Sequence, residues 1–167
     1  DSLSIQFTRG CPFNCDFCNV TAMLGHQVRY KSTAQIIREL NNIYDLGWRQ
    51  NIFFVDDNFI GNKKYIKTEL LPAIIEWRKD KTGCALLTEV SINLSDDEEL
   101  MEMMSAAGFH SVFVGIETPD EAGLEECQKS QNCRRDLVES VKKMQHHGLQ
   151  VMGGFIVGFD SDTPSTF

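Results

Sequence analysis

The chain has 167 residues, enough for one domain with a core of its own. Its formal net charge of −8, from 24 acidic against 16 basic side chains, argues against the basic face that nucleic-acid binding requires. The composition, 42% hydrophobic and 24% charged, is that of an ordinary globular domain, and no apolar run approaches the roughly 20 residues of a membrane span. We therefore expect no nucleic-acid patch and no transmembrane segment.

A short strand is expected over residues 3–8, where apolar and polar residues alternate. It leads into a loop that carries Cys11, Cys15 and Cys18, separated by three and then two residues. Thiolates at this spacing can converge on one soft metal centre without help from distant parts of the fold. Because iron–sulfur clusters and structural zinc sites normally take four protein ligands, three cysteines leave one coordination position open to a small molecule.

Other interpretations of this loop stay open on spacing alone. The three cysteines could hold zinc with His26 as the fourth ligand, form a disulfide, or be unrelated buried thiols. The remaining cysteines, Cys84, Cys127 and Cys133, show no regular spacing. We therefore expect a reduced, cytoplasmic protein and no disulfide framework.

Capping signals predict where the helices begin and end. Ser32 with Gln35 forms a capping box, and Gly47 ends the helix that follows. Ser95 with Glu98 forms a second capping box before the next amphipathic run.

Two further helices carry prolines near their starts or within them. Thr118 as N-cap, Pro119 in the first turn and Glu121 predict one helix start. A long helix is expected over about residues 63–81, and Pro72 should kink it, shift it or divide it in two.

Apolar runs between the helices predict strands that are buried on both faces. These strands are expected over residues 51–56, about 85–93, 111–117 and about 149–157, the last one after a helix at about 134–147. Five alternations of strand and helix are typical of an α/β fold with a parallel sheet and helical crossovers, bent into part of a (β/α) barrel.

Acidic residues recur where these strands end, at Asp56, Asp57, Glu89, Glu117 and Asp160. Active sites of such barrels lie at the C-terminal ends of the strands. Acids also favour the helix N-termini that follow, but Glu89 and Glu117 fit that explanation less well because they lie within or at the end of apolar strands. We expect Asp56 or Asp57, Glu89 and Glu117 to line one cavity beside the cysteine loop.

The pattern Cys-x3-Cys-x-aromatic-Cys, met by Cys11, Cys15, Phe17 and Cys18, closely resembles the radical S-adenosylmethionine (SAM) superfamily. The resemblance implies a partial TIM barrel and a [4Fe–4S] cluster held by the three cysteines, with the amino and carboxylate groups of SAM on its fourth iron. An electron from the cluster then cleaves the sulfonium and releases a 5′-deoxyadenosyl radical. The resemblance also implies a reductant such as flavodoxin or ferredoxin, and a family core of six strand–helix units, of which about five are present.

The resemblance further implies residues that bind SAM. The amino-group contact would follow the second strand, where Asp56 and Asp57 stand, and ribose contacts would lie near the fourth and fifth strands. The family's Gly-x-Ile-x-Gly-x-x-Glu stretch, which supports the adenine, is matched by Gly154, Ile156 and Gly158. In this chain Ser161 stands where that stretch has its glutamate, and Asp160 is a doubtful substitute. Carboxylates suit SAM because its sulfonium, ammonium and ribose hydroxyls offer positive charge or hydrogen-bond donors.

Residues 55–63, 115–119 and 154–160 are similar to those of cobalamin-dependent radical SAM proteins of the hopanoid methyltransferase type. That similarity implies methylation of an unreactive carbon in a small-molecule or lipid-like substrate. Cobalamin would be bound by a domain outside these residues, because the chain has no Asp-x-His-x-x-Gly cobalamin motif. We expect flanking domains at both ends, since Thr163 and Pro164 resemble the start of another helix.

Two alternatives are kept. One is methylthiotransferase-like radical SAM chemistry on tRNA or protein, which shares the pattern of acids at the strand ends. The other is a non-catalytic module in which the cysteines and His26 hold zinc. We expect the chain on its own to be a poor catalyst, with an open sheet edge at which copies can associate.

Overall fold

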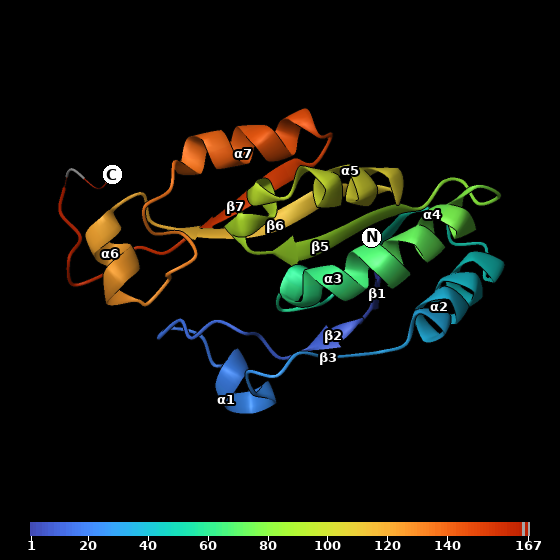
Figure 1. The fold of residues 1–167 in the computed structure, drawn as a ribbon, viewed down its shortest axis with the longest axis horizontal. Helices are drawn as coiled ribbons and strands as arrows, with labels where there is room; N and C mark the ends of the chain where they lie inside the picture. Colours follow the sequence, from blue (N-terminus) through green and yellow to red (C-terminus); the bar gives the residue numbers. More distant parts are fainter. Residues whose placement is uncertain (165, 167) are drawn as a thin grey trace.

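The structure, a computed structural model, describes residues 1–164 and 166. Its centre is a sheet of five parallel strands in the order β1-β4-β5-β6-β7, with helices against one face (Figure 1). The predicted α/β class with a parallel sheet is confirmed. The strands are β1 (Ser2–Ile5), β4 (Asn51–Phe54), β5 (Ala85–Val90), β6 (Phe109–Glu117) and β7 (Gln150–Phe155).

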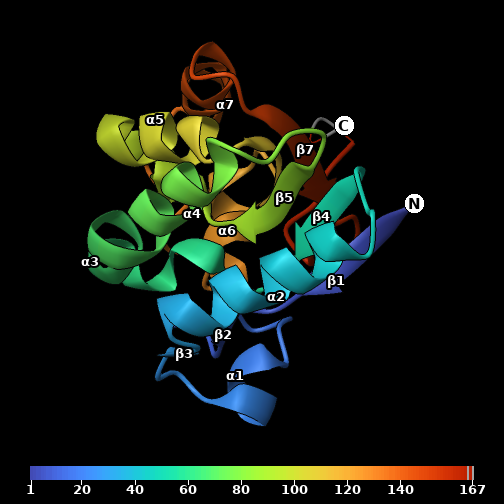
Figure 2. The same cartoon turned by 90° about the vertical axis from the view of Figure 1, so that its right-hand side faces the viewer.

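The connecting helices gather on one side of the curved sheet, as Figure 2 shows from the side. The longer ones are α2 (Thr33–Asp45), α4 (Leu71–Arg78), α5 (Glu98–Ala106) and α7 (Leu137–His146). Among the described residues, no helix is long and apolar enough to cross a membrane.

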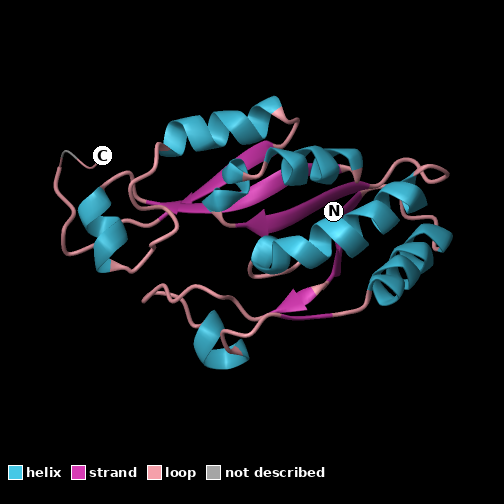
Figure 3. Cartoon of the chain, in the orientation of Figure 1, coloured by secondary structure: helices cyan, strands magenta, loops and turns pink. Residues whose placement is uncertain are grey.

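Shorter elements occupy the connections, and Figure 3 shows the two short strands and the short helix of the cysteine loop apart from the main sheet and its helices. They include an antiparallel pairing of two short strands that frames the cysteine loop. They are β2 (Thr8–Arg9), α1 (Val20–Leu24), β3 (Arg29–Tyr30), η1 (Phe59–Asn62), α3 (Lys63–Tyr65), η2 (Ile66–Leu70), η3 (Ile92–Asp96) and α6 (Glu121–Glu126).

The core lies between the sheet and its helices, because alternate strand residues point to that face. Phe54, Phe59 and Phe109 form its aromatic centre, with ring centroids 5.0–5.4 Å apart. The opposite face of the sheet is open. There Glu89, Phe113 and Met152 are cross-strand neighbours on β5, β6 and β7, and Phe113 and Met152 are 39% and 40% exposed.

The first capping prediction is confirmed. The Ser32 hydroxyl accepts from the Gln35 N–H, and the Gln35 side chain accepts in turn from the Ser32 N–H at 2.8 Å. Gly47 has φ +82°, a left-handed conformation that favours glycine and ends the helix.

The long helix expected near residues 63–81 is divided, as Pro72 predicted. The chain passes from α3 through the π-helical turn η2 into α4, and Pro72 lies in the first turn of α4. Proline has no N–H to donate to the preceding turn, so a wider turn immediately before it keeps the segment helical.

Two capping predictions are wrong by two residues each. Asp97, and not Ser95, caps α5 by accepting from the Leu100 N–H at 3.1 Å. Ser95 lies inside η3, where its hydroxyl donates to the Ile92 carbonyl at 2.9 Å. A tight 3-10 turn before the helix therefore moves the cap forward along the chain.

The cap before α6 is likewise Asp120, which accepts from the Ala122 N–H at 3.1 Å. The Thr118 hydroxyl accepts from the Asp120 N–H instead, forming a turn ahead of the helix. The helix expected to start at Thr163 runs into residues 165 and 167, which lie outside the described part of the chain.

Candidate functional site

A cavity of about 150 Å³ opens at the carboxyl ends of the strands, beside the cysteine loop. That volume is below the roughly 300 Å³ of a typical small-molecule pocket, so a cofactor the size of SAM would extend out along the open face of the sheet. The cavity brings together most of the chemistry-bearing residues that the sequence predicted. Its polar lining includes Cys11, Cys15, Cys18, Asp57, Glu89, Glu117, Lys129 and Gln131.

The cysteine loop begins at Gly10, which has φ +97°. A Cβ at this position would lie 2.7 Å from the Gln27 carbonyl oxygen, so only glycine lets the loop pass this close to the returning chain. The Cys11 N–H donates to the Gly25 carbonyl at 3.3 Å, and the Cys18 N–H donates to the Cys15 carbonyl at 3.0 Å. Backbone contacts thus set the loop's shape.

The three loop cysteines are free thiols that share one cavity wall. Burial raises the pKa of the Cys11 thiol, and the neighbouring Cys15 and Cys18 raise it further. Among the described residues, their sulfurs do not lie close enough together to form a metal-ligand group. The donor set itself, three soft sulfurs around one cavity, fits an iron–sulfur cluster with one open position.

His26 does not support the zinc alternative. Its side chain is exposed and does not line the cavity that holds the cysteines. The three other cysteines, Cys84, Cys127 and Cys133, are also free thiols.

Asp57 and Glu89 form the acidic wall of the cavity. Burial raises the pKa of Glu89, and the nearby Asp57 and Asp56 carboxylates raise it further. Asp57 Oδ2 is buried and accepts no hydrogen bond from the described residues. Such an acceptor is costly to leave unpaired, so this wall suits a positively charged donor.

Asp56 lies elsewhere, although the sequence predicted it as a cofactor contact. It is 1% exposed and accepts from the Phe7 N–H at 3.2 Å and from the Thr8 N–H. Burial raises its pKa, while these two N–H groups act in the opposite direction. The structure therefore does not bring Asp56 to the cavity. Its carboxylate instead fixes the chain between β1 and β2 to the end of β4.

Glu117 reaches the cavity from the last residue of β6, where its φ of +66° is unusual for a residue other than glycine. Lys129 Nζ lies 2.6 Å from Glu117 Oε1, and the two side chains are only 12% and 8% exposed. Lys129 Nζ is also 5.6 Å from the centroid of the Phe17 ring. Sequence reasoning missed Lys129 because it lies in an irregular segment with no motif around it.

Phe17 lines the cavity and is 44% exposed, so its ring is available to a ligand. The cavity lining does not include Gly154, Ile156 or Gly158. Two of these residues nevertheless contact residues that line the cavity. A Cβ at Gly154 would lie 2.7 Å from the Phe113 ring, which does line the cavity. The Ile156 N–H donates to the Glu117 carbonyl at 2.8 Å.

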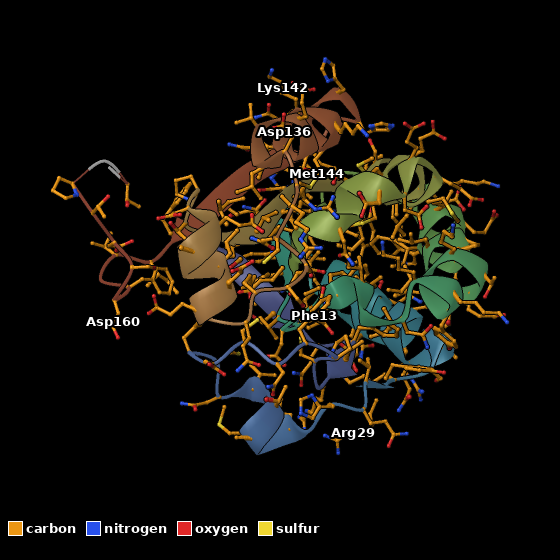
Figure 4. All side chains as sticks on the ribbon, turned by 60° about the vertical axis from the view of Figure 1, so that its left-hand side comes forward. Phe13, Arg29, Asp136, Lys142, Met144 and Asp160 are labelled. Atoms are coloured by element: carbon orange, nitrogen blue, oxygen red, sulfur yellow. The ribbon has the colours of Figure 1, made fainter. Side chains whose placement is uncertain are left out.

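Gly158 and Asp160 lie beyond the end of β7. The Gly158 N–H donates to Asp162 Oδ2 at 2.8 Å, which turns the chain away from the sheet. Figure 4 shows Asp160 on the outlying loop, away from Phe13, which lines the cavity. Asp160 therefore does not take the place of the glutamate that Ser161 replaces, and the structure does not bring it to the site.

Comparisons with known proteins agree with this geometry. A profile of the radical SAM superfamily matches residues 5–167. The chain is 48% identical to an uncharacterized methyltransferase of Synechocystis over 97% of its length, and 41% identical to the hopanoid C-2 methylase of Rhodopseudomonas palustris over 98%. It spans only 30% and 31% of the lengths of those two proteins.

Among solved structures, the chain is similar to the radical SAM methyltransferase TsrM from Kitasatospora setae, determined with cobalamin and a [4Fe–4S] cluster bound. The TM-score is 0.83 over 98% of this chain and 32% of TsrM. At 20% identity this likeness establishes the fold alone. Since the superfamily profile covers all but the first four residues, the chain belongs to the radical SAM superfamily.

Proposed function

We propose that this chain is the core of a radical SAM methyltransferase that modifies an unreactive carbon. The observation that carries the proposal is the single cavity at the strand ends. Three free cysteines line it together with three carboxylates, Asp57, Glu89 and Glu117. The two relatives described above, both named as methyl-transferring proteins, favour methyl transfer over the methylthiotransferase alternative.

Cys11, Cys15 and Cys18 would hold a [4Fe–4S] cluster, which supplies the electron that cleaves the sulfonium of SAM. Backbone hydrogen bonds of Cys11 and Cys18 hold the loop, all three thiols line one cavity, and each cysteine is only partly exposed. An external one-electron donor of the flavodoxin or ferredoxin type would be needed. A cytoplasmic location would keep the thiols reduced.

The acidic wall would bind the positive and hydrogen-bonding groups of SAM. Asp57, with its unpaired buried oxygen, would accept from the ammonium, assisted by Glu89. Glu117 would accept from the ribose hydroxyls, and Lys129 holds its carboxylate in place. Phe17 and the Gly154–Gly158 stretch would flank the adenine.

The open face of the sheet suits an apolar or lipid-like substrate. Phe113 lines the cavity and lies beside Met152, and both are well exposed. A hydrocarbon skeleton laid on Phe113 and Met152 would present a carbon to the cavity. Cobalamin, which is bound in the solved TsrM structure, would here be bound by residues outside this chain.

Anaerobic reconstitution of the full-length protein with iron and sulfide tests the proposal. We expect a brown protein with four irons that converts SAM to 5′-deoxyadenosine when reduced. Replacing Cys11, Cys15 or Cys18 with alanine should abolish iron binding, whereas Cys133→Ala should not. A colourless protein that binds one zinc tightly would instead establish the metal-binding module.

A further inference from the structure

The segment of residues 127–132, which follows α6, packs against the cysteine loop although the two are more than 100 residues apart in the sequence. The Asp16 N–H donates to the Cys127 carbonyl at 3.0 Å. Gln128 Nε2 donates to Asp16 Oδ1 at 2.6 Å, and Asn14 Nδ2 donates to Gln128 Oε1 at 3.3 Å. Backbone and side-chain contacts therefore fix this segment, which we call the α6 clamp, to the loop that carries the thiols.

Gln131 is the residue of the α6 clamp that contacts a sulfur. Its Nε2 lies 3.8 Å from Cys15 Sγ, within hydrogen-bonding distance for sulfur. Its Oε1 is buried and has no hydrogen-bond partner among the described residues. A thiolate accepts hydrogen bonds and does not donate them, so the amide must present its N–H to Cys15 and leave its oxygen toward the rest of the cavity.

The α6 clamp is anchored to β6, and this anchoring limits how far Gln131 can move. The buried Asn132 donates through Nδ2 to the Gly115 and Ile116 carbonyls, each at 3.0 Å. The Asn132 N–H donates to the Lys129 carbonyl at 2.9 Å, and the Lys129 side chain pairs with Glu117. Gln131 thus lies between two fixed residues.

We propose that Gln131 is a positioning residue for the metal centre, which directs its amide N–H at the Cys15 sulfur and raises the reduction potential of the cluster. The inference rests on the proposed function, because it requires a cluster on Cys15. A donor to a ligating sulfur stabilises the reduced, more negative state more than the oxidised state. Removing the donor therefore makes the cluster harder to reduce.

The test is a redox titration of the reconstituted full-length protein without SAM, followed by electron paramagnetic resonance. Gln131→Met keeps the side-chain length and removes the donor, and Gln131→Glu replaces the donor with a carboxylate. At the wild-type midpoint we expect the ratio of reduced to oxidised cluster to fall about tenfold in Gln131→Met, a shift of about 59 mV for one electron. The fall should be larger in Gln131→Glu.

Gln128→Met is the matched control. It makes the same substitution three residues earlier, and it removes contacts to Asn14 and Asp16 but none to a sulfur. It should bind four irons and keep the wild-type midpoint.

The other outcomes show whether the inference about Gln131 or the proposed function is wrong. An unchanged midpoint in both Gln131 variants, with four irons bound, overturns the inference and leaves the proposed function intact. Loss of iron in both variants with a wild-type circular dichroism spectrum also overturns it, because Gln131 would then serve cluster assembly and not potential. A wild-type protein that binds no cluster overturns the proposed function itself.

Discussion

Asp56 and Asp57 are neighbours in the sequence, yet they meet different surroundings. Asp56 turns inward and accepts two backbone N–H groups, whereas Asp57 turns to the cavity and keeps one buried oxygen unpaired. The sequence predicted a carboxylate here but could not separate the two. Which of the two carboxylates faces the cavity depends on the direction in which each side chain points after β4. That direction follows from the positions of the Phe7 and Thr8 N–H groups in space, which the local sequence does not give.

This difference predicts opposite consequences of mutation. Asp56→Ala should lower the free energy of unfolding by about 2–4 kcal/mol, because it leaves the Phe7 and Thr8 N–H groups buried without an acceptor. Asp57→Ala should change stability by less than about 1 kcal/mol but weaken SAM binding at least tenfold, a loss of about 1.4 kcal/mol. Urea unfolding and calorimetry measure the two effects, and equal destabilisation by both variants would contradict the assignment.

Glu89 gives a pH-dependent prediction. Its pKa is raised in the folded protein by burial and then by Asp57 and Asp56. Between its ordinary pKa and the raised one, the folded state binds more protons than the unfolded state, so stability falls as pH rises through that window. Glu89→Gln keeps the neutral shape and should raise the free energy of unfolding above the window.

The same variant should have no effect below about pH 4, where Glu89 is protonated in both states. Urea unfolding curves of the two proteins at acidic and neutral pH give the comparison. A stability difference that is the same at both pH values would show that the charge of Glu89 is not its cause.

At the scale of elements, β6 and β7 place a pair of glycines side by side where the cavity begins. Gly115 lines the cavity and is the cross-strand neighbour of Gly154. Neither position has a positive φ, so these glycines are needed for space and not for backbone conformation. The absence of two Cβ atoms leaves room for the Glu117–Lys129 ion pair and for the Phe113 ring.

Gly115→Ala should therefore disturb the site more than the fold. The new Cβ would fall on the Glu117 carboxylate and lie 2.8 Å from the Lys129 ammonium. Both groups end flexible side chains that can move aside, so we expect the free energy of unfolding to fall by about 1 kcal/mol or less. SAM affinity, measured by calorimetry in the full-length protein, should fall at least tenfold. Gln150→Ala, exposed at the other end of β7, is the control, and equal affinities in the two variants would contradict this role for the pair.

At the scale of the whole molecule, the sequence predicted the parallel sheet because each strand is a local apolar run and the helices α2, α5 and α7 begin at residues whose side chains cap them. The α6 clamp has no such local signal. The Gln128 side chain contacts Asp16, which lies 112 positions earlier in the chain, and the Gln131 side chain contacts Cys15, which lies 116 positions earlier. Contacts of this kind arise only when β6 brings its connection beside the cysteine loop, so periodicity and capping rules could not reveal Lys129 or Gln131.

The open edge of the sheet carries the last prediction. In the described sheet β7 pairs only with β6, and Phe155 and Val157 near its end are 65% and 73% exposed. An unpaired strand edge with exposed apolar side chains is a template for association. The segment 1–167 expressed alone should therefore self-associate as its concentration rises in analytical ultracentrifugation, and Phe155→Lys should reduce the association. Since the segment spans only 30% and 31% of the lengths of the two relatives, any SAM cleavage by the segment alone should release 5′-deoxyadenosine without a methylated product. A segment that stays monomeric and couples SAM cleavage to methyl transfer would show that this edge needs no further part of the protein to complete the site.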